Sequence, residues 1–291
     1  MDTYLGIDGG GSGSRALVVD ENGTLLWRRE GPSAHCRELS REAFWTNLDI
    51  FWEGIQKEGF TPAGVAMGLS GVVSPGMAEA LARDGSGRWG IPQHSILIES
   101  DLKAAHRGGF QNEPGIALIS GTGSSCLGRG TAGRWHQCGG WGSLLDDAGS
   151  AYQMGLAGLR LALRMLDGRE ARTALERRLL QALEMETPQE LVQWIHETGN
   201  RKKTIARLFL ELLTLEKEGD SQAAAILKRG RNALVELVVA TARSLHLPKP
   251  SLILVGNVAR QEGTFRMRLR QALLEALPDA KIVSEQLPPE A

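Results

Sequence analysis

The sequence of 291 residues has no long apolar run and almost no net charge. No stretch approaches the ~20 apolar residues that a membrane-spanning helix needs, so we expect no membrane partner. The 33 basic and 34 acidic side chains nearly cancel, and this balance gives no indication of a nucleic-acid-binding surface. Arg201-Lys202-Lys203 is the densest basic cluster, and three adjacent charges on an expected helix are typical of a solvated face.

Cysteine is also scarce, with three residues at Cys36, Cys126 and Cys138. The count is odd, and the first residues show neither a basic segment nor a small-residue cleavage site. Both features favour reduced thiols and a cytoplasmic protein. No Cys or His pair has the spacing of zinc ligands.

A phosphate loop of the Gly-Lys-Ser/Thr type is missing as well, although glycine is abundant and clustered. The segment Asp8-Gly9-Gly10-Gly11-Ser12 follows an apolar strand. A P-loop would need a lysine and then a helix, and a dinucleotide fold would need a helix where residues 15–19 predict a strand. The remaining possibility is a hairpin whose turn binds the β- and γ-phosphates of ATP through backbone amides. We expect Asp8 to hold Mg²⁺ through water, because Mg²⁺ dehydrates reluctantly.

A second loop, Gly121-Thr122-Gly123-Ser124, follows the apolar strand 115–119 in the same way. One such loop would be explained as a flexible turn, but two at the head of each half favour phosphate binding and a weak internal duplication. The backbone amides and the Thr122 hydroxyl are expected to bind the nucleotide phosphates. Gly256-Asn257, between a strand and a helix, is predicted to pass close to the adenine or ribose.

The apolar periodicity predicts an α/β fold with a β-sheet at the head of each half and a helical insertion in the second. Asn22-Gly23 predicts a two-residue hairpin turn, and Ser40 suits an N-cap. The expected strands are 4–7, 16–19, 24–27, 64–69, 95–98, 115–119 and 251–255, and the expected helices are 40–57, 75–83, 102–107, several within 148–246, and 262–276.

Further motifs complete a pattern that extends over nearly the whole chain. They are Asp8-Gly9-Gly10-Gly11-Ser12, Glu99-Ser100-Asp101, Gly121-Thr122-Gly123-Ser124, Cys138-Gly139-Gly140-Trp141-Gly142 with Asp147-Ala148-Gly149-Ser150, and Val255-Gly256-Asn257-Val258. In this order they resemble the BadF/BadG/BcrA/BcrD ATPase family, and within it the N-acetylglucosamine and glucosamine kinases. The resemblance implies two ribonuclease-H-like domains of the actin-like ATPase type, 1–106 and 107–291, which close over ATP and sugar, usually as a homodimer.

The resemblance also implies roles for individual residues. From local sequence alone, Asp101 is equally well explained as a helix N-cap, but the matching family residue is the catalytic base. Asp147 matches a residue that holds sugar hydroxyls, and His35 stands where family members usually carry Asn. Ala148 stands where they carry Glu. The other residues expected to face the sugar are Ser70, Gly71, Gly139 and Gly140.

Two side chains near these motifs receive a structural interpretation. Trp141 is expected to pack in the core, and Cys138 is expected to be a packed thiol. The sequence thus predicts ATP-dependent phosphorylation of an amino sugar, either N-acetylglucosamine or glucosamine. The alternatives are an activator ATPase that uses a cysteine-ligated iron–sulfur cluster and a sugar or nucleotide sensor without turnover.

Overall fold

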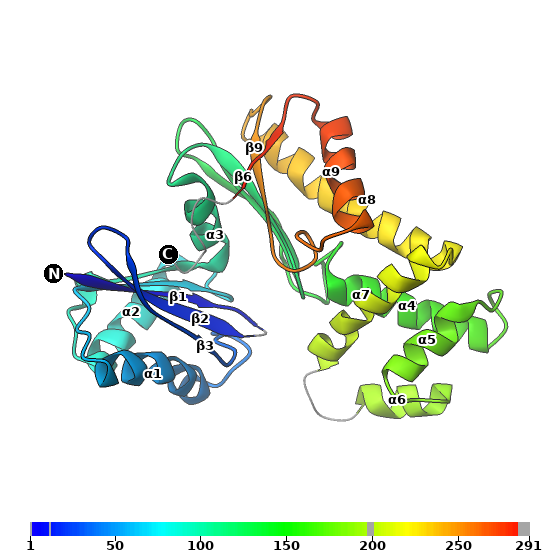
Figure 1. Ribbon diagram of the computed structural model, residues 1–291, viewed down its shortest axis with the longest axis horizontal. Helices are drawn as coiled ribbons and strands as arrows, with labels where there is room; N and C mark the ends of the chain where they lie inside the picture. The colour runs from blue at the N-terminus through cyan, green and yellow to red at the C-terminus, as the bar shows by residue number, and fades with distance from the viewer. Residues whose placement is uncertain (1, 12, 197–200, 285–291) are drawn as a thin grey trace. The chain divides into compact units, whose positions relative to one another are not determined.

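The computed structural model describes residues 2–11, 13–196 and 201–284. They form two compact units that divide between Glu113 and Pro114, and each unit is built around its own five-stranded sheet (Figure 1). The boundary predicted after residue 106 falls inside helix α3 (Asp101–Phe110). This helix packs tightly on the first sheet, because a Cβ added to Gly68 would lie 2.4 Å from the Cβ of Ala104. The whole of α3 therefore belongs to the first unit.

The first sheet has the strand order β3-β2-β1-β4-β5. Strand β1 is parallel to β4, and β4 is parallel to β5, whereas β2 and β3 form antiparallel hairpins beside β1. The expected strands are all present, and all of them except 64–69 run beyond their predicted ends. Their bounds are β1 (Thr3–Gly9), β2 (Ser14–Asp20), β3 (Leu25–Gly31), β4 (Gly64–Leu69) and β5 (Ile96–Ser100).

The turn between β2 and β3 is wider than the two residues predicted at Asn22-Gly23. Strand β2 ends at Asp20 and β3 begins at Leu25, which leaves four residues between them. The Asp20 carboxylate accepts hydrogen bonds from the amides of Asn22 (2.9 Å) and Thr24 (2.8 Å). This side chain supports the wider turn, which is also closed by backbone hydrogen bonds from the Asp20 amide to the Thr24 carbonyl (3.1 Å) and from the Gly23 amide to the Asp20 carbonyl (3.0 Å).

Helices α1 (Arg41–Lys57) and α2 (Pro75–Trp89) cover one face of the first sheet (Figure 1). Ser40 is the N-cap of α1, as predicted, and its hydroxyl accepts a hydrogen bond from the amide of Ala43 (3.2 Å). The stripe predicted for this helix is buried against the sheet, and each such side chain contributes roughly 1.5–3 kcal/mol. Its members are Phe44, Leu48, Phe51 and Ile55.

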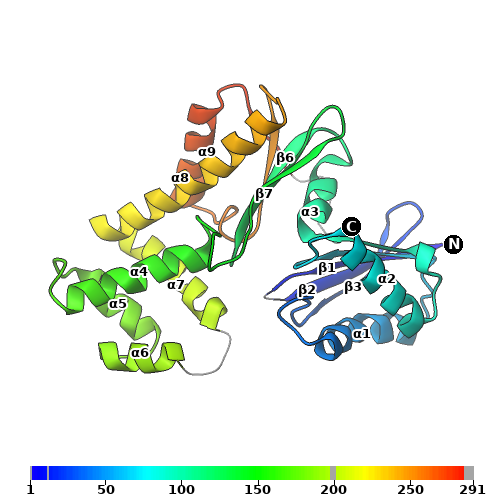
Figure 2. The ribbon, with the colours of Figure 1, turned by 180° about the vertical axis from the view of Figure 1, so that it is seen from behind.

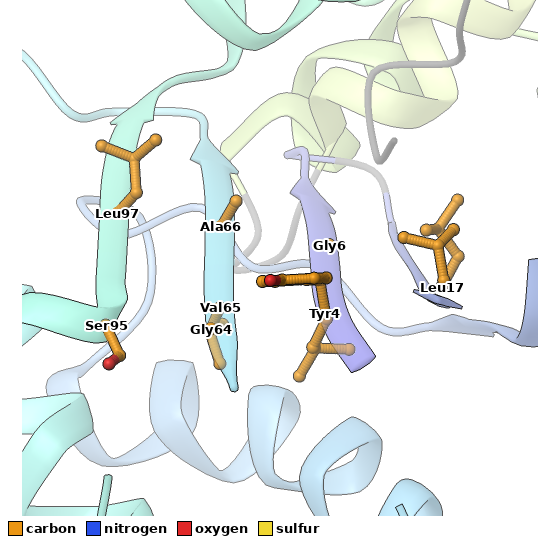
Figure 3. Close-up of a pocket in the computed structure, with 10 residues that line it drawn as sticks. Tyr4, Gly6, Leu17, Gly64, Val65, Ala66, Ser95 and Leu97 are labelled. Carbon is orange, nitrogen blue, oxygen red and sulfur yellow. The ribbon is translucent and has the colours of Figure 1, made fainter. Parts of the chain in front are cut away.

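The other face of this sheet carries a hollow of about 220 Å³ (Figure 3). Side chains alternate between the two faces of a strand, so Leu5 lies in the core whereas its neighbour Tyr4 is 42% exposed in this hollow. Leu97 of β5 lines the hollow too and is 53% exposed. The two faces of the sheet therefore differ sharply in burial.

The second sheet repeats the topology of the first. Its order is β10-β9-β6-β7-β8, with β6 parallel to β9 and antiparallel to β7. In both units the leading strand has an antiparallel pair on one side and parallel strands on the other, which agrees with the predicted duplication. The strands are β6 (Gly115–Ser120), β7 (Ser124–Arg129), β8 (Trp135–Gly139), β9 (Ser251–Val255) and β10 (Lys281–Ile282).

The region between β8 and β9 is helical, as expected (Figure 2). Leu234 and Val238 of α8 are fully buried in one core with Ile116 and Leu118 of β6. The helices are α4 (Ala151–Leu166), α5 (Ala174–Ala182), α6 (Pro188–His196), α7 (Arg201–Lys217) and α8 (Ser221–Ser244), and α9 (Thr264–Ala276) follows β9.

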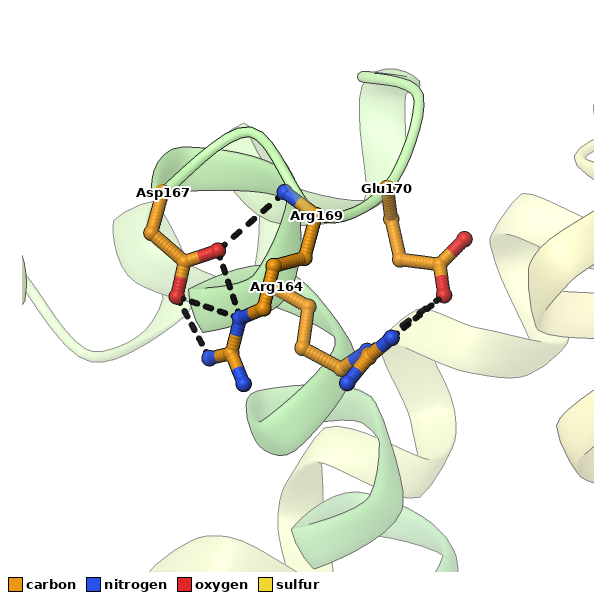
Figure 4. A network of polar contacts seen from close by, with 4 residues as sticks. All are labelled: Arg164, Asp167, Arg169 and Glu170. Atoms are coloured by element: carbon orange, nitrogen blue, oxygen red, sulfur yellow. Dashed lines mark hydrogen bonds and ion pairs between the residues drawn. The ribbon is translucent and has the colours of Figure 1, made fainter.

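Two ion pairs bracket the end of α4 (Figure 4). Arg164 donates to Glu170 at 3.0 Å, and the Arg169 guanidinium lies against the Asp167 carboxylate. Such exposed pairs contribute little free energy, on the order of 0–1 kcal/mol each, and they lie at the turn that leads toward α5. Across the described ranges, no helix has the length and apolarity required to cross a bilayer.

Candidate active site

The parallel register of the first sheet brings the predicted residues of the first unit to one edge. Gly9 of β1 lies opposite Leu69 of β4, and Leu69 lies opposite Ser100 of β5. The next residues along the three strands are therefore Gly10, Ser70 and Asp101, side by side. This is the carboxyl-terminal edge, where open α/β sheets bind their ligands.

The glycine turn after β1 is closed by a hydrogen bond from the Gly10 amide to the Gly13 carbonyl (3.0 Å). Asp8, one residue before the end of β1, points to the face opposite Ile7 and is partly exposed. A Cβ on Gly9 would lie 2.6 Å from Leu69 Cδ2, so a larger residue at this position would require the end of the Leu69 side chain to move. Ser12, also predicted to bind phosphate, lies outside the described residues.

Asp101 is the first residue of α3 and is not its N-cap. That position belongs to Ser100, whose hydroxyl accepts a hydrogen bond from the Lys103 amide (3.3 Å). The Asp101 carboxylate accepts hydrogen bonds from the Leu102 amide (2.9 Å) and from the Ser70 hydroxyl. Burial raises the pKa of Asp101 above its ordinary value, and the Ser70 hydrogen bond opposes that rise. The capping interpretation is thus excluded, and Asp101 remains a carboxylate held in a defined orientation.

Backbone hydrogen bonds connect the Ser70 turn to the loop that carries His35. The Ser70 amide donates to the Gly9 carbonyl (2.8 Å), and the Ser70 carbonyl accepts from the Cys36 amide (3.1 Å). His35 Nδ1 accepts from the Glu38 amide (3.2 Å), so this nitrogen stabilises its own turn. Gly71 has φ +93°, and a Cβ there would lie 2.9 Å from His35 Cε1. His35, Ser70, Gly71 and Asp101 therefore form one connected cluster.

The second unit holds its own loop, Gly121–Ser124, between β6 and β7. The Gly121 amide donates to the Gly123 carbonyl (2.9 Å), and the Gly121 carbonyl accepts from the Ala151 amide (2.9 Å). The Ser124 hydroxyl donates to the Ala148 carbonyl (2.8 Å). These bonds fasten the loop to the first residue of α4 and to the segment before it, whereas Thr122 stays partly exposed.

Gly256 lies next to this loop because β6 and β9 are parallel and Ile119 pairs with Val255. Its φ is +88°, and a Cβ would come within 2.5 Å of the Ser120 carbonyl oxygen. The same oxygen accepts a hydrogen bond from the Val258 amide (2.9 Å). Only glycine fits this position without moving backbone, and Asn257 follows it on the surface.

Gly139, Gly140 and Asp147 complete the second cluster, and all three have positive φ. A Cβ on Gly140 would lie 2.6 Å from Ser125 Oγ, and a Cβ on Gly123 would lie 3.2 Å from Asp147 Oδ2. The Asp147 carboxylate is therefore packed beneath the Gly121–Ser124 loop. Burial raises the pKa of Asp147 above its ordinary value, and the charge of Lys202 opposes that rise.

Two interpretations from sequence are wrong. Lys202 does not belong to a merely solvated face, because its Nζ lies 3.7 Å from Asp147 Oδ2. Trp141 is 66% exposed and does not pack in the core. Glycines on both sides of Trp141, at 140 and 142, were the signal that this segment leaves the sheet. No local signal joins Lys202 to Asp147.

The donor sets fit a magnesium nucleotide. Mg²⁺ is commonly bound by one or two carboxylates together with substrate phosphates, and Asp8 beside the glycine turn provides such a carboxylate. Among the described residues no group of three or more His, Cys, Asp and Glu side chains is placed to hold a metal. A Cβ on Gly9 would meet Leu69 and a Cβ on Gly256 would meet the Ser120 carbonyl, so these two glycines permit tight packing within each unit beside the loops.

The two five-stranded sheets place this protein in a class by fold, because solved sugar kinases have the same overall fold. The crystal structure of a candidate N-acetylglucosamine kinase from Chromobacterium violaceum has a TM-score of 0.77 at 24% identity and covers 100% of this chain and 96% of that one. A ROK family glucokinase from Streptomyces griseus, in complex with glucose and AMPPNP, has a TM-score of 0.62 at 18% identity and covers 99% and 95%.

The sequence then gives the family. The chain belongs to the BadF/BadG/BcrA/BcrD ATPase family, whose model matches residues 5–289. The N-acetylmuramic acid/N-acetylglucosamine kinase of Clostridium acetobutylicum is 29% identical over 98% of this chain and 94% of its own length. The N-acetyl-D-glucosamine kinase of Dictyostelium discoideum is 27% identical, with 99% and 95% covered.

Proposed function

We propose that this protein is an ATP-dependent kinase that phosphorylates an amino sugar, N-acetylglucosamine or glucosamine. The observation that carries the proposal is the position of Asp101. Its carboxylate is oriented by the Ser70 hydroxyl, and it lies at the same edge of the sheet as the Asp8–Gly11 turn. The curated relatives over nearly the full length are kinases of N-acetylglucosamine and N-acetylmuramic acid by name, which supports the same substrate class.

In this proposal Asp101 is the catalytic base. Its carboxylate accepts the proton of the sugar hydroxyl as that oxygen attacks the γ-phosphorus of ATP, and the products are a sugar phosphate and ADP. Phosphoryl transfer depends mainly on positioning and on charge stabilisation, so a base held by two hydrogen bonds is well suited to the task. Bound Mg²⁺, held by Asp8, would offset the negative charge of the phosphates.

The two glycine-lined loops bind the nucleotide phosphates in the proposed site. The Gly10 and Gly121 amides already close the two loops, so we assign the phosphate contacts to the amides of Gly11, Thr122 and Gly123 and to the Thr122 hydroxyl. The Ser124 hydroxyl donates to the Ala148 carbonyl and the Ser124 amide donates to the Asp147 carboxylate, so we assign to Ser124 the role of holding the loop in shape beside the phosphates. Gly256 and Asn257 bind the adenosine part of the nucleotide.

The remaining predicted residues bind the sugar. Asp147 accepts sugar hydroxyl hydrogens, since a carboxylate has several acceptor sites, and Gly139 and Gly140 keep the approach open. His35 and Gly71 adjoin Ser70 in the first unit and contact the sugar, with His35 in place of the usual Asn.

We further infer the finer architecture and context from the family. The two units are ribonuclease-H-like domains of the actin-like type, and their matching strand orders support this assignment. Helices α4–α7 are an insertion into the second domain. The protein is inferred to act in the cytoplasm as a homodimer.

The cysteines favour the kinase over an iron–sulfur activator. A cluster needs thiolate ligands, but burial raises the pKa of Cys126 to about 12. Cys138 lies opposite Cys126 in the register of β7 and β8, and both thiols are free. Cys138 packs against the same core, as predicted for a packed thiol. The Cys36 thiol donates to the Ser70 carbonyl (3.3 Å). The sensor alternative differs from the kinase in predicting ligand-induced stabilisation without turnover.

A coupled assay of ADP release across hexoses, amino sugars and N-acetyl sugars tests the proposal. We expect Mg-ATP turnover to depend on an amino or N-acetylamino sugar and to be low with plain hexoses. Turnover that does not depend on any sugar would instead support an ATPase, and binding without turnover would support a sensor.

A further inference from the structure

The positive charge beside Asp147 comes from a helix that is distant from Asp147 in the sequence. Lys202, in the first turn of α7, has its Nζ 3.7 Å from Asp147 Oδ2. The Asp147 side chain is 7% exposed and the Lys202 side chain 30% exposed. The pair therefore combines a buried carboxylate with an ammonium group that reaches it from a partly solvated position.

The packing of α7 on α4 sets this contact. Gly155 of α4 lies so close to α7 that an added Cβ would be 2.1 Å from the Ile205 carbonyl oxygen. Residues three apart lie on the same side of a helix, so Lys202 projects one turn before Ile205. Asp147 precedes Ser150, the N-cap of α4. A close crossing at Gly155 and Ile205 thus fixes the distance between the lysine and the carboxylate.

The surroundings of Asp147 leave its carboxylate little freedom. It lies beneath Gly123, and its own backbone has φ +64°, an uncommon conformation for a residue with a side chain. The Asp147 carbonyl accepts a hydrogen bond from the Ser150 amide (3.0 Å). Both the backbone and the packing therefore direct the carboxylate toward the loop.

The charged groups that act on the pKa of Asp147 lie on α7 and in the segment of Asp147 itself. Lys202 of α7 favours its ionised form, and Asp146 in the same segment disfavours it. Arg229 of α8 lines the neighbouring hollow together with Asp146 and Ala148. Burial is the largest influence and raises the pKa of Asp147, so the loss of Lys202 would raise it further.

We propose that Lys202 is a positioning residue of the sugar-phosphorylating site, where it holds the Asp147 carboxylate beneath the Gly121–Ser124 loop and supplies its counter-charge. The inference rests on the proposed function, in which Asp147 accepts the sugar hydroxyls. Lys202 acts through Asp147 and need not touch the sugar. The neighbouring Lys203, which is exposed, has no such role.

The kinetic test compares Lys202→Met with the matched variant Lys203→Met. We expect Lys202→Met to lower kcat/KM for the amino sugar roughly ten- to a hundredfold, because small displacements of a binding group cost that much. The KM for the sugar should rise more than the KM for ATP. The loss of kcat/KM should be largest at low pH, because Asp147 without its lysine partner becomes protonated at a higher pH than in the wild type. Lys203→Met leaves these values unchanged, and Lys202→Arg restores most of the activity because it restores the positive charge.

A second measurement does not depend on turnover. Thermal unfolding of Lys202→Met and Lys203→Met is followed as a function of pH, with and without Asp147→Asn. The raised pKa of Asp147 means that stability is lost as pH rises through the folded-state value. We therefore expect Lys202→Met to be less stable than Lys203→Met at neutral pH, with the difference shrinking in acid and disappearing in the Asp147→Asn background.

The outcomes separate the inference from the proposed function. A wild-type protein without sugar-dependent turnover counts against the function, and the unfolding experiment still decides whether Lys202 pairs with Asp147. Equal sugar kinetics in the two lysine variants, or a stability difference that persists in Asp147→Asn, would overturn the inference.

Discussion

The two clusters of predicted site residues differ in how the chain holds them. In the first unit, Asp8, Ser70 and Asp101 follow from the register of three parallel strands, so the sheet itself places two carboxylates. In the second unit, strand register places the glycines at 121 and 256, but the carboxylate of Asp147 lies on a segment held by helices.

This difference separates two kinds of dependence on the fold. A cluster set by strand register tolerates changes in distant helices, because the strands carry its geometry. A cluster set by helix packing is sensitive to close backbone approaches such as the one at Gly155 and Ile205. The two sheets therefore have matching strand orders, but the helices between β8 and β9 give the second sheet a different support.

The largest expected effect belongs to the first cluster. Asp101→Asn should lower turnover by about 10²- to 10⁴-fold, the usual loss of a general base, while ATP and sugar still bind. The raised pKa of Asp101 makes its ionised form costly, so the neutral variant should be more stable than wild type above the ordinary aspartate pKa and equal to it below.

Steady-state kinetics and thermal unfolding against pH provide the measurement for Asp101→Asn. Asp279→Asn on the exposed surface of the second unit is the control and should change neither quantity. Turnover of Asp101→Asn at the wild-type rate would exclude Asp101 as the base.

A second prediction compares glycines in the two clusters. Gly256→Ala brings a Cβ against the Ser120 carbonyl at positive φ. We expect backbone strain to lower the free energy of unfolding by roughly 1–3 kcal/mol and nucleotide binding to weaken. Gly9→Ala meets the flexible end of Leu69, so the first cluster should lose less stability. Denaturant unfolding measures both.

The control for these glycines is Gly87→Ala in α2, where an added Cβ meets nothing within 4 Å. This change should stabilise the protein by about 0.5–1 kcal/mol, because alanine is the better helix former. If Gly256→Ala were as stable as Gly87→Ala, the tight approach of β9 to the Gly121–Ser124 loop would be wrong.

Much of this arrangement was predictable from sequence, because apolar strands and glycine turns are local signals. The stripe of α1 and the strand that ends before Asp101 follow from periodicity and turn residues. The N-cap of α3 was missed, since Ser100 and Asp101 are both good caps and only geometry distinguishes them. Lys202 was missed for a different reason, because its partner depends on how α7 crosses α4. Trp141 was misjudged because an apolar side chain is usually buried.

The smallest expected effect tests the contact between Ser70 and Asp101. The Ser70 hydrogen bond lowers the pKa of Asp101 against the effect of burial, so Ser70→Ala should raise that pKa. The acid limb of the rate profile then moves to higher pH, with a modest loss of activity at neutral pH. Ser86→Ala removes a hydroxyl that donates to the Ile91 carbonyl (2.7 Å), and its pH profile should match wild type.

Identification of the product tests the central claim most directly. Purified protein is incubated with Mg-ATP and N-acetylglucosamine or glucosamine, and the sugar is analysed by mass spectrometry and phosphorus NMR. The account predicts one phosphate ester on the sugar for each ADP formed. ADP accompanied by free inorganic phosphate and an unmodified sugar, or no ADP at all, would contradict it.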